Sequence, residues 1–401
     1  MNKLTATFKS STPWKVFLVS VLMAGISYGL YKGIIDNYLA EVVGCGEFEK
    51  GVTEFFRELP GVLMIIVLAV FYMQSAENLY KIGSIIFMIG MAMHAIVPPT
   101  QVMITLAILI MSTGDHIHLT VRNYMPMNYA HTGKSGSALG CLNSIHQFGT
   151  LFGYIVVAIV FALMPSDQPF NLFFWLASAF AAVCTICSFR LTSSSKTDNN
   201  AHRFYFKKKF KKYYMLEVFY GARKQVFLTF GPYVLILFYG ASTATVSMLF
   251  AITAVVGFIA SPLVGKIIDK FGYRIVMIMD TLILVIVCFF YGFSHMIFPR
   301  EVAFIICCVN YVLDSIISLA SMASNVYVQD IADNEQEIKA TISTGISVNH
   351  IISIFIALFG GLLWKVLGMQ VLFIVSAVLG LCNSAYAASI KPVKRGIPNQ
   401  S

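Results

Sequence analysis

Long apolar stretches separated by short polar breaks fill almost the whole chain of 401 residues. Each stretch has about the 20 residues that an α-helix needs to cross a bilayer, whereas a membrane β-strand needs only about 9–11. The pattern therefore predicts an all-α integral membrane protein with twelve transmembrane helices. The predicted spans are residues 14–42, 51–74, 79–98, 100–124, 136–163, 169–190, 213–239, 242–264, 272–295, 301–328, 338–363 and 366–389.

A polar, basic segment at residues 192–212 separates the sixth span from the seventh. It predicts a linker between two bundles of six helices, residues 1–191 and 213–401. Matching residues recur in both parts, which indicates a parallel repeat and predicts that a pseudo-two-fold axis relates the bundles. The matches at a shift of 192 residues are Tyr28 with Tyr220, Lys32 with Lys224 and Glu77 with Asp269, and His146 matches His350 at a shift of 204.

The composition agrees with a membrane protein and excludes an ordinary soluble domain. The chain is 58% hydrophobic and 12% charged, with a mean hydropathy of +0.77, whereas soluble domains are about 25% charged. If both termini are cytoplasmic, 20 of the 28 Lys and Arg residues lie in cytoplasmic segments and only Lys50, Arg300 and Lys365 lie in outer loops. Because Lys and Arg accumulate on the cytoplasmic side, we expect a multi-pass protein of the cytoplasmic (inner) membrane with both termini inside.

The net charge of +9 is explained by this topology and does not indicate nucleic-acid binding. The basic run from Lys207 to Lys212 comes just before the seventh span, where attraction to anionic lipid is the better explanation. No phosphate-binding G-x-x-x-x-G-K-[ST] motif is present. Cys184 and Cys187 lie inside a predicted helix, where redox or zinc chemistry is not expected. We therefore expect no cofactor, no bound metal and no enzymatic activity.

The segment from Gly265 to Arg274 lies between the second and third predicted helices of the second part and fits the pattern G-x-x-x-D-[RK]-x-G-x-[RK]. It resembles motif A of the major facilitator superfamily. The counterpart in the first part keeps little more than Glu77 and Lys81. The resemblance implies the twelve-helix fold of that superfamily and a gating role in which Asp269 caps a helix and pairs with basic groups between the halves, latching the outward-open state. The gating residues are Gly265, Asp269, Lys270, Gly272, Arg274 and Glu77.

The first predicted helix carries a cation at bilayer depth, where charges are rare and usually face a cavity or a partner. Tyr28, Lys32 and Asp36 recur every four residues and so share one helix face. Gly25, Gly29 and Gly33 form a neighbouring smooth face that favours close helix packing. We interpret Lys32 as a cavity-facing cation tuned by Asp36. An internal salt bridge and a Lys32 side chain that snorkels outward remain alternatives.

The seventh helix carries Arg223 and Lys224, which either face the same cavity or, if the helix begins near Ala222, lie at the cytoplasmic surface. Other helices carry polar groups at helical spacing, among them Glu54, Arg57 and Glu58, for which a rim ion pair is the simplest interpretation. The predicted substrate-binding residues are Tyr28, Lys32, His146, Tyr220, Arg223, Lys224, Asn349 and His350. The predicted residues for proton coupling or charge pairing are Asp36, Asp115, His118, Arg122 and Asp314.

Together these features predict a secondary active transporter that works by alternating access. The basic residues favour a small polar solute, anionic or zwitterionic, and the carboxylates and histidines make proton symport a hypothesis. A multidrug efflux transporter and a non-transporting membrane sensor of the same fold are the alternatives. We expect a monomer whose partners are the solute, protons and the lipid bilayer, with no nucleic acid.

Overall fold

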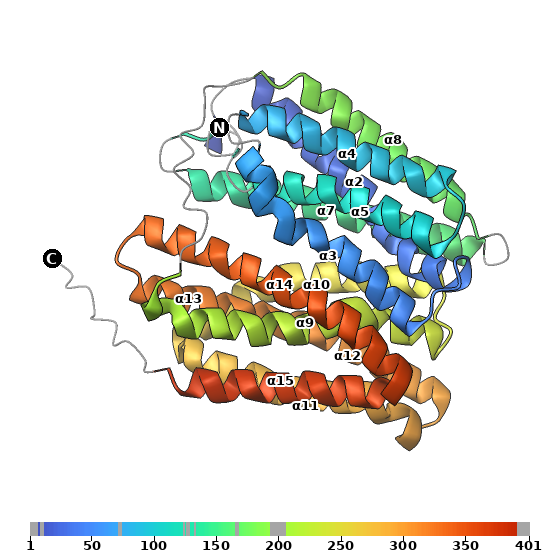
Figure 1. Ribbon diagram of the computed structural model, residues 1–401, viewed down its shortest axis with the longest axis vertical. Coiled ribbons are helices and arrows are strands. Elements are labelled where there is room, and N and C mark those ends of the chain that lie inside the picture. The colour runs from blue at the N-terminus through green and yellow to red at the C-terminus, as the bar shows by residue number, and fades with distance from the viewer. Residues whose placement is uncertain are drawn as a thin grey trace. The chain divides into compact units, whose positions relative to one another are not determined.

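The computed structural model describes residues 7–8, 12–70, 74–122, 125, 129–131, 134–164, 168–192 and 206–390. These residues are almost entirely helical, and an isolated bridge between Phe8 and Ala130 is the β-type pairing found among them. Most of the predicted linker, residues 193–205, lies outside the described residues. The long helices are labelled in Figure 1.

The first six long helices match the first six predicted spans to within a few residues. Their ends agree because the apolar stretches stop where polar residues and turns begin. The helices are α2 (Thr12–Glu41), α3 (Glu47–Val70), α4 (Ala76–Ile96), α5 (Gln101–Arg122), α7 (Ser135–Leu163) and α8 (Phe170–Phe189).

The remaining helices match the predicted spans as well, with one interruption. The span predicted as residues 301–328 is divided into α12 (Arg300–Ile317), a 3₁₀ segment η2 (Ser318–Ser321) and α13 (Met322–Ile331). At this break the Tyr220 hydroxyl donates a hydrogen bond to the Ser318 carbonyl. The others are η1 (Lys208–Phe210), α9 (Lys211–Leu237), α10 (Thr243–Phe271), α11 (Tyr273–Ile297), α14 (Glu335–Leu367) and α15 (Met369–Ala388).

Ten of the described helical segments are long and apolar enough to cross a membrane. The other two long helices, α3 and α9, are continuous but less apolar, because they contain charged residues such as Glu54 and Arg223. The apolar part of a membrane offers no partners to charged groups. The buried charged groups of these helices, such as Glu54 and Arg223, must therefore find partners inside the protein.

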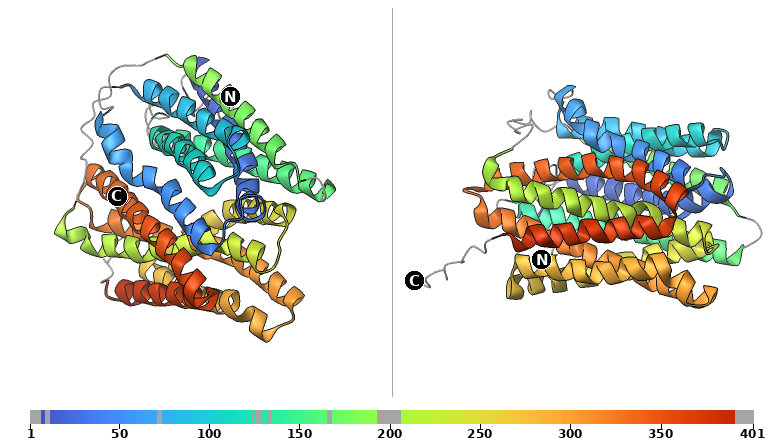
Figure 2. Two further views of the ribbon diagram at one scale, coloured as in Figure 1. Left: turned by 45° about the vertical axis from the view of Figure 1, so that its right-hand side comes forward. Right: turned by 60° about the horizontal axis from the view of Figure 1, so that its bottom comes forward.

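The chain forms two compact units whose division differs from the position of the linker. The first unit comprises residues 1–200 and 232–255, and the second comprises residues 201–231 and 256–401. The end of α9 and the beginning of α10 thus pack with the first unit. Within each unit the long helices run alongside one another (Figure 2). We describe each unit separately.

In the first unit, the glycines of α2 allow it to pack closely against α7. A side chain added at Gly25 would collide with the His146 carbonyl, and one added at Gly29 would collide with the Thr150 carbonyl. Gly153 of α7 meets the backbone of α2 in the same way. The predicted smooth face of α2 is confirmed, and it fixes the position of the polar face beside it.

In the second unit, the basic run is paired with acidic groups at the start of α14. Lys207 and Lys209 both form ion pairs with Glu337, and Lys209 Nζ also lies 2.7 Å from Asp333 Oδ2. Weak desolvation acts to lower the pKa of Lys209, but the bonds to Asp333 and Glu337 outweigh it and raise the pKa. Part of the run thus anchors the chain before α9, a role that the interpretation based on lipid attraction alone did not include.

Candidate functional site

A charged hollow lies within the first unit, between α2, α3 and α5. About 370 Å³ of this region is free of protein atoms, part of it open to the outside, and the space is so narrow that it admits about one water-sized group at a time. Its polar lining residues are Tyr28, Tyr31, Lys32, Lys50, Glu54, Arg57, Ser112 and Asp115. The predicted stripe on α2 therefore faces a hollow, as the cavity interpretation requires.

Cations and carboxylates alternate along one side of this hollow. Lys32 Nζ lies 2.7 Å from Asp36 Oδ2, which makes the predicted partnership within α2. Lys50 Nζ lies 2.7 Å from Asp36 Oδ1 and 2.7 Å from Glu54 Oε1, and its side chain is only 1% exposed. Lys50 therefore joins α2 to α3. We call Lys32, Asp36, Lys50, Glu54, Arg57 and Glu58 the charge ladder.

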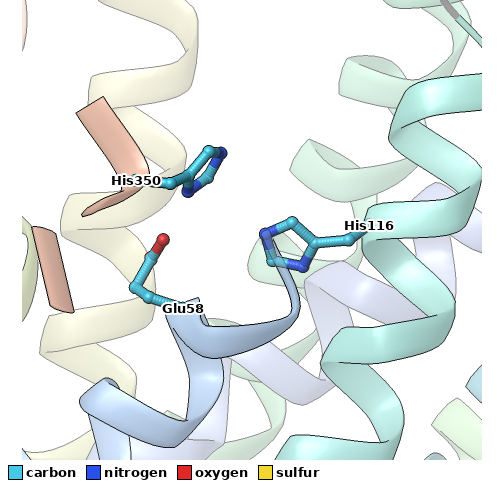
Figure 3. Close-up of side chains that lie close together, drawn as sticks. All are labelled: Glu58, His116 and His350. Atoms are coloured by element: carbon cyan, nitrogen blue, oxygen red, sulfur yellow. The ribbon is translucent and has the colours of Figure 1, made fainter. Parts of the chain in front are cut away.

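Arg57 and Glu58 complete the charge ladder. Arg57 Nε lies 2.5 Å from Glu54 Oε2, and its guanidinium also pairs with Glu58. The Glu58 carboxylate and the His116 ring, from α3 and α5, point toward one another with ligand atoms within 4.8 Å (Figure 3). The expected ion pairing of Arg57 is present, but Arg57 lines the hollow instead of marking its rim. His350, also drawn in Figure 3, belongs to the second unit.

Asp115 is the carboxylate of the hollow that the ladder does not use. It is half-buried on α5 and makes no hydrogen bond or ion pair with any other described residue. On the side of α2, the rings of Tyr28 and His146 lie with their centroids 6.5 Å apart. The structure thus brings Tyr28, Lys32 and Asp115 to one hollow and places His146 beside Tyr28.

His118 and Arg122, predicted to act with Asp115, are positioned differently. His118 is buried, its Nε2 lies 2.8 Å from Ser84 Oγ, and its ring stacks on Tyr80. Arg122 ends α5 and has a buried Nε without a hydrogen-bond partner among the described residues. Among the described residues no ion pair joins these side chains to Asp115, so shared spacing on one helix did not produce direct contact.

The second unit holds its own buried cation. Arg223 is 1% exposed, and its Nη2 lies 2.5 Å from Asp280 Oδ2. The guanidinium also stacks over the Tyr220 ring at 4.4 Å from the centroid. Arg223 is therefore held by an interaction inside this unit.

Lys224, the neighbour of Arg223, is exposed and makes no hydrogen bond or ion pair with any other described residue. The helix α9 begins at Lys211, thirteen residues earlier, which is roughly 20 Å of helical rise. The alternative in which this helix begins near Ala222 is therefore wrong. Lys224 lies in the middle of a long helix.

The other predicted residues of the second unit are spread over two helices. Asp314 is buried on α12, close enough to Arg223 to feel its charge. Asn349 and His350 are half-buried on α14, where Asn349 packs against Gly221 of α9. Their proposed contact with a solute stays a prediction.

The motif at residues 265–274 does not lie in a loop, because α10 runs to Phe271 and includes Gly265, Asp269 and Lys270, and α11 begins at Tyr273. One residue of the motif has a backbone conformation that explains its identity. Gly272 has a φ of 83°, which a residue without a side chain adopts readily, and it directly precedes α11. Asp269 is exposed and makes no bond with another described residue, and the start of α11 has no side-chain cap. Its first-half counterpart, Glu77, is buried and accepts a hydrogen bond from the Tyr129 hydroxyl. The latch role of both residues stays a prediction.

Two important charged residues were missed from the sequence. Lys50 was assigned to an outer loop, although its spacing of four from Glu54 on a helix was visible. Asp280 is a lone carboxylate in a strongly apolar stretch, which is itself a signal of a buried partner. Two of their partners, Asp36 for Lys50 and Arg223 for Asp280, could not be named because they lie on other helices.

Comparisons with known proteins agree with this architecture. The family model of the Major Facilitator Superfamily matches residues 17–336 and 213–400, whereas no curated protein matches the sequence. The structure of the nucleoside transporter NupG is similar with a TM-score of 0.75 at 14% identity, covering 95% of this chain and 100% of that one. A D-xylose-proton symporter is similar with a TM-score of 0.72 at 14% identity, covering 95% and 98%.

A third similar structure is that of a POT family transporter in complex with 5-aminolevulinic acid. Its TM-score is 0.70 at 11% identity, covering 92% of this chain and 94% of that one. At such low identity these likenesses show the fold alone, and the family model shows the membership. A multi-pass membrane transporter, and not an enzyme, is the class that the family model indicates. The chain belongs to the major facilitator superfamily.

Proposed function

We propose that the protein is a secondary active transporter of a small zwitterionic organic solute across the cytoplasmic membrane. The observation that carries this proposal is the hollow of the first unit, which offers both signs of charge to a guest. Its cationic groups are Lys32 and Arg57, and its available carboxylate is Asp115. An acidic group of the solute would pair with the cations, and a basic group of the solute would pair with Asp115.

The cationic side of the hollow suits a carboxylate or a phosphate. The side chains of Lys32 and Arg57 are 17% and 22% exposed, whereas Lys50 is enclosed between two carboxylates. Lys32 has a single carboxylate partner in Asp36. Lys and Arg bind planar or tetrahedral oxyanions through charge-assisted hydrogen bonds. An acidic group of the solute would therefore be held at these two residues.

Asp115 favours a positively charged group on the solute. Among the described residues no Lys or Arg lies within ion-pairing distance of its carboxylate, although the charge of Arg122 acts on it, and an unpaired charge is expensive at bilayer depth. A protonated amine on the solute would supply the missing charge. For this reason a zwitterion fits better than a simple anion, since an anion would leave Asp115 without a partner.

The narrowness of the hollow is consistent with alternating access. The space admits about one water-sized group at a time, so a solute must enter when the surrounding side chains move apart. The alternative of a hydrophobic drug fits less well, because the lining is dominated by charged and hydroxyl groups. Proton coupling, with Asp314 as the residue that takes up the proton, is part of the proposal.

The similar structures do not decide the solute, because their printed substrates differ: a nucleoside, 5-aminolevulinic acid and D-xylose. The support comes from the charges in the hollow. A sensor that has kept the fold but does not cycle would bind a ligand in the same hollow, and only a flux measurement separates that case from transport.

Ligand-dependent thermal stability tests the binding step. Purified protein is screened against zwitterionic amino acids and short peptides, organic anions, nucleosides, sugars and cationic drugs. We expect stabilisation by a zwitterion, and its loss in Lys32→Met and in Asp115→Asn. Lys81→Met is the matched control, because this residue of α4 touches only Asn78, at 3.5 Å. Stabilisation confined to drugs, or equal in all variants, would contradict the proposal.

A further inference from the structure

A second, smaller hollow lies wholly within the second unit, beside the break between α12 and α13. About 220 Å³ of it is free of protein atoms, part of it open to the outside, and it also admits about one water-sized group. Its polar lining residues are Tyr220, Asp280, Ser321, Ser324 and Asn383. Such a space is large enough for a bare ion without any movement of the surrounding side chains.

The Tyr220 and Ser324 hydroxyls, which line this hollow, already donate hydrogen bonds to other groups. The Tyr220 hydroxyl donates to the Ser318 carbonyl. The Ser324 hydroxyl donates to Glu217 at 2.8 Å, and Arg223 donates to Asp280. The two hydroxyls and the Asp280 carboxylate therefore have oxygen lone pairs to offer a cation.

One of these oxygens is buried without any partner. Asn383 is 2% exposed, and its Oδ1 makes no hydrogen bond with another described residue. A buried polar atom left unpaired costs about 1–3 kcal/mol. Since Asn383 lines the hollow, its carbonyl oxygen is available to whatever occupies that space.

The local charge also favours a cation. Asp280 is neutralised by Arg223, but Glu217 and Asp314 are buried as well and form no ion pair with another described residue. The positive charge of Lys224, which is exposed, attracts both the Glu217 and the Asp314 carboxylates. The interior of this unit therefore carries more carboxylates than buried cations.

The break in the helix adds backbone oxygens. The segment η2 interrupts the path from α12 to α13 at Ser318–Ser321, and Ala320 and Ser321 line the hollow. An interrupted membrane helix exposes carbonyl groups, and the end of its first half carries partial negative charge. Hard cations prefer oxygen ligands of this kind.

We propose that this hollow binds a small monovalent cation, with Na⁺ as the ion that fits best, held by Asn383 Oδ1, the Ser321 and Ser324 hydroxyls, Asp280 and carbonyls of the broken helix. A single charge is sufficient because Arg223 already balances Asp280. The narrow space favours Na⁺ over the larger K⁺. A role for this ion in driving solute movement rests on the proposed transport function, but its binding does not.

Binding of Na⁺ alone, with no solute present, tests the inference. The full-length protein is unfolded by heat in NaCl, KCl and choline chloride at equal ionic strength, and equilibrium binding of ²²Na⁺ gives the stoichiometry. We expect saturable stabilisation specific to Na⁺ and about one bound ion per chain. Equal stabilisation by the three salts, together with no saturable ²²Na⁺ binding, would overturn the site.

Variants of α15 test the location. Asn383→Leu removes the unpaired oxygen and should weaken ²²Na⁺ binding at least tenfold, whereas Asn383→Asp should keep it. The matched control is Ser376→Ala, a change of another buried residue of α15 that does not line the hollow. If Asn383→Leu does not fold, Ser324→Ala replaces it with the same expectation. Undiminished binding in the folded variant would refute the location, and absent solute flux with intact Na⁺ binding would refute only transport.

Discussion

Replacing Lys50 by methionine should destabilise the first unit strongly. The Lys50 ammonium lies 2.7 Å from oxygens of both Asp36 and Glu54, and the side chain is 1% exposed. At an effective dielectric constant of about 20, two unit charges at this distance attract by roughly 6 kcal/mol. Desolvation offsets much of that attraction, but removing one partner leaves buried carboxylates undercompensated, which costs about 3–5 kcal/mol. Methionine fills a similar volume, so the loss reports charge and not a cavity.

The free energy of unfolding in bicelles measures this loss, and a second substitution identifies its cause. Without Lys50 the charge ladder has one carboxylate more than it has cations. Glu54→Gln in the Lys50→Met background removes this excess, because Lys32 then pairs with Asp36 and Arg57 with Glu58, and should recover about 1–2 kcal/mol. Lys81→Met, a change of a half-buried lysine that has no ion pair among the described residues, should stay within about 0.5 kcal/mol of the parent. A Lys50→Met protein as stable as the Lys81→Met control would refute the reasoning.

Three further changes test separate parts of the structure. Gly29→Ala presses a methyl group against the backbone of α7 and should destabilise the protein by about 1–3 kcal/mol, measured by thermal unfolding. Tyr233→Phe removes the 2.7 Å hydrogen bond to the Cys45 carbonyl and should cost about 1 kcal/mol in the same assay. Glu337→Gln weakens the anchor of Lys209, so trypsin should cut the basic run several times faster in a time course.

Each of these changes has a control. Gly140→Ala adds a methyl group where no atom lies within 4 Å and should leave stability unchanged. Asp333→Asn alters an exposed partner of the basic run, with a side chain 76% exposed, and should affect trypsin cleavage less. An equal effect of Gly29→Ala and Gly140→Ala on stability would contradict the close packing of α2 on α7. Faster cleavage of Asp333→Asn than of Glu337→Gln would contradict the role of Glu337 as the anchor. An unchanged melting temperature in Tyr233→Phe would show that its hydrogen bond contributes nothing.

The helices were predictable because the property that forms them is local. A bilayer imposes a minimum apolar length, and the predicted span 136–163 differs by one residue from α7 at Ser135–Leu163. The interruption at Ser318–Ser321 was not predicted, because the stretch around it stays apolar. The Tyr220 hydroxyl bonded to a carbonyl at that break comes from a helix about 100 residues away in the chain.

The candidate site was predictable only in part, because local spacing predicts contacts within one helix but not contacts between helices. Spacing within α2 placed Lys32 beside Asp36, and that pair is present. Spacing on α5 also placed Asp115 near His118, but packing against Tyr80 holds the histidine elsewhere. A pair such as Arg223 with Asp280 depends on how separate helices pack, which no single stretch of sequence contains.

Solute flux into proteoliposomes tests most directly the claim that the protein transports a zwitterionic solute bound at Lys32 and Asp115. The parent protein and the Lys32→Met, Asp115→Asn and Lys15→Met variants are reconstituted at equal density and assayed for uptake of labelled zwitterions, anions and sugars under an imposed ion gradient. Lys15 is an exposed lysine of α2 and serves as the control. We predict concentrative uptake of a zwitterion by the parent and Lys15→Met proteins, and at least a tenfold loss in the other two. No uptake of any solute by the parent, or equal uptake by all four proteins, would contradict the claim.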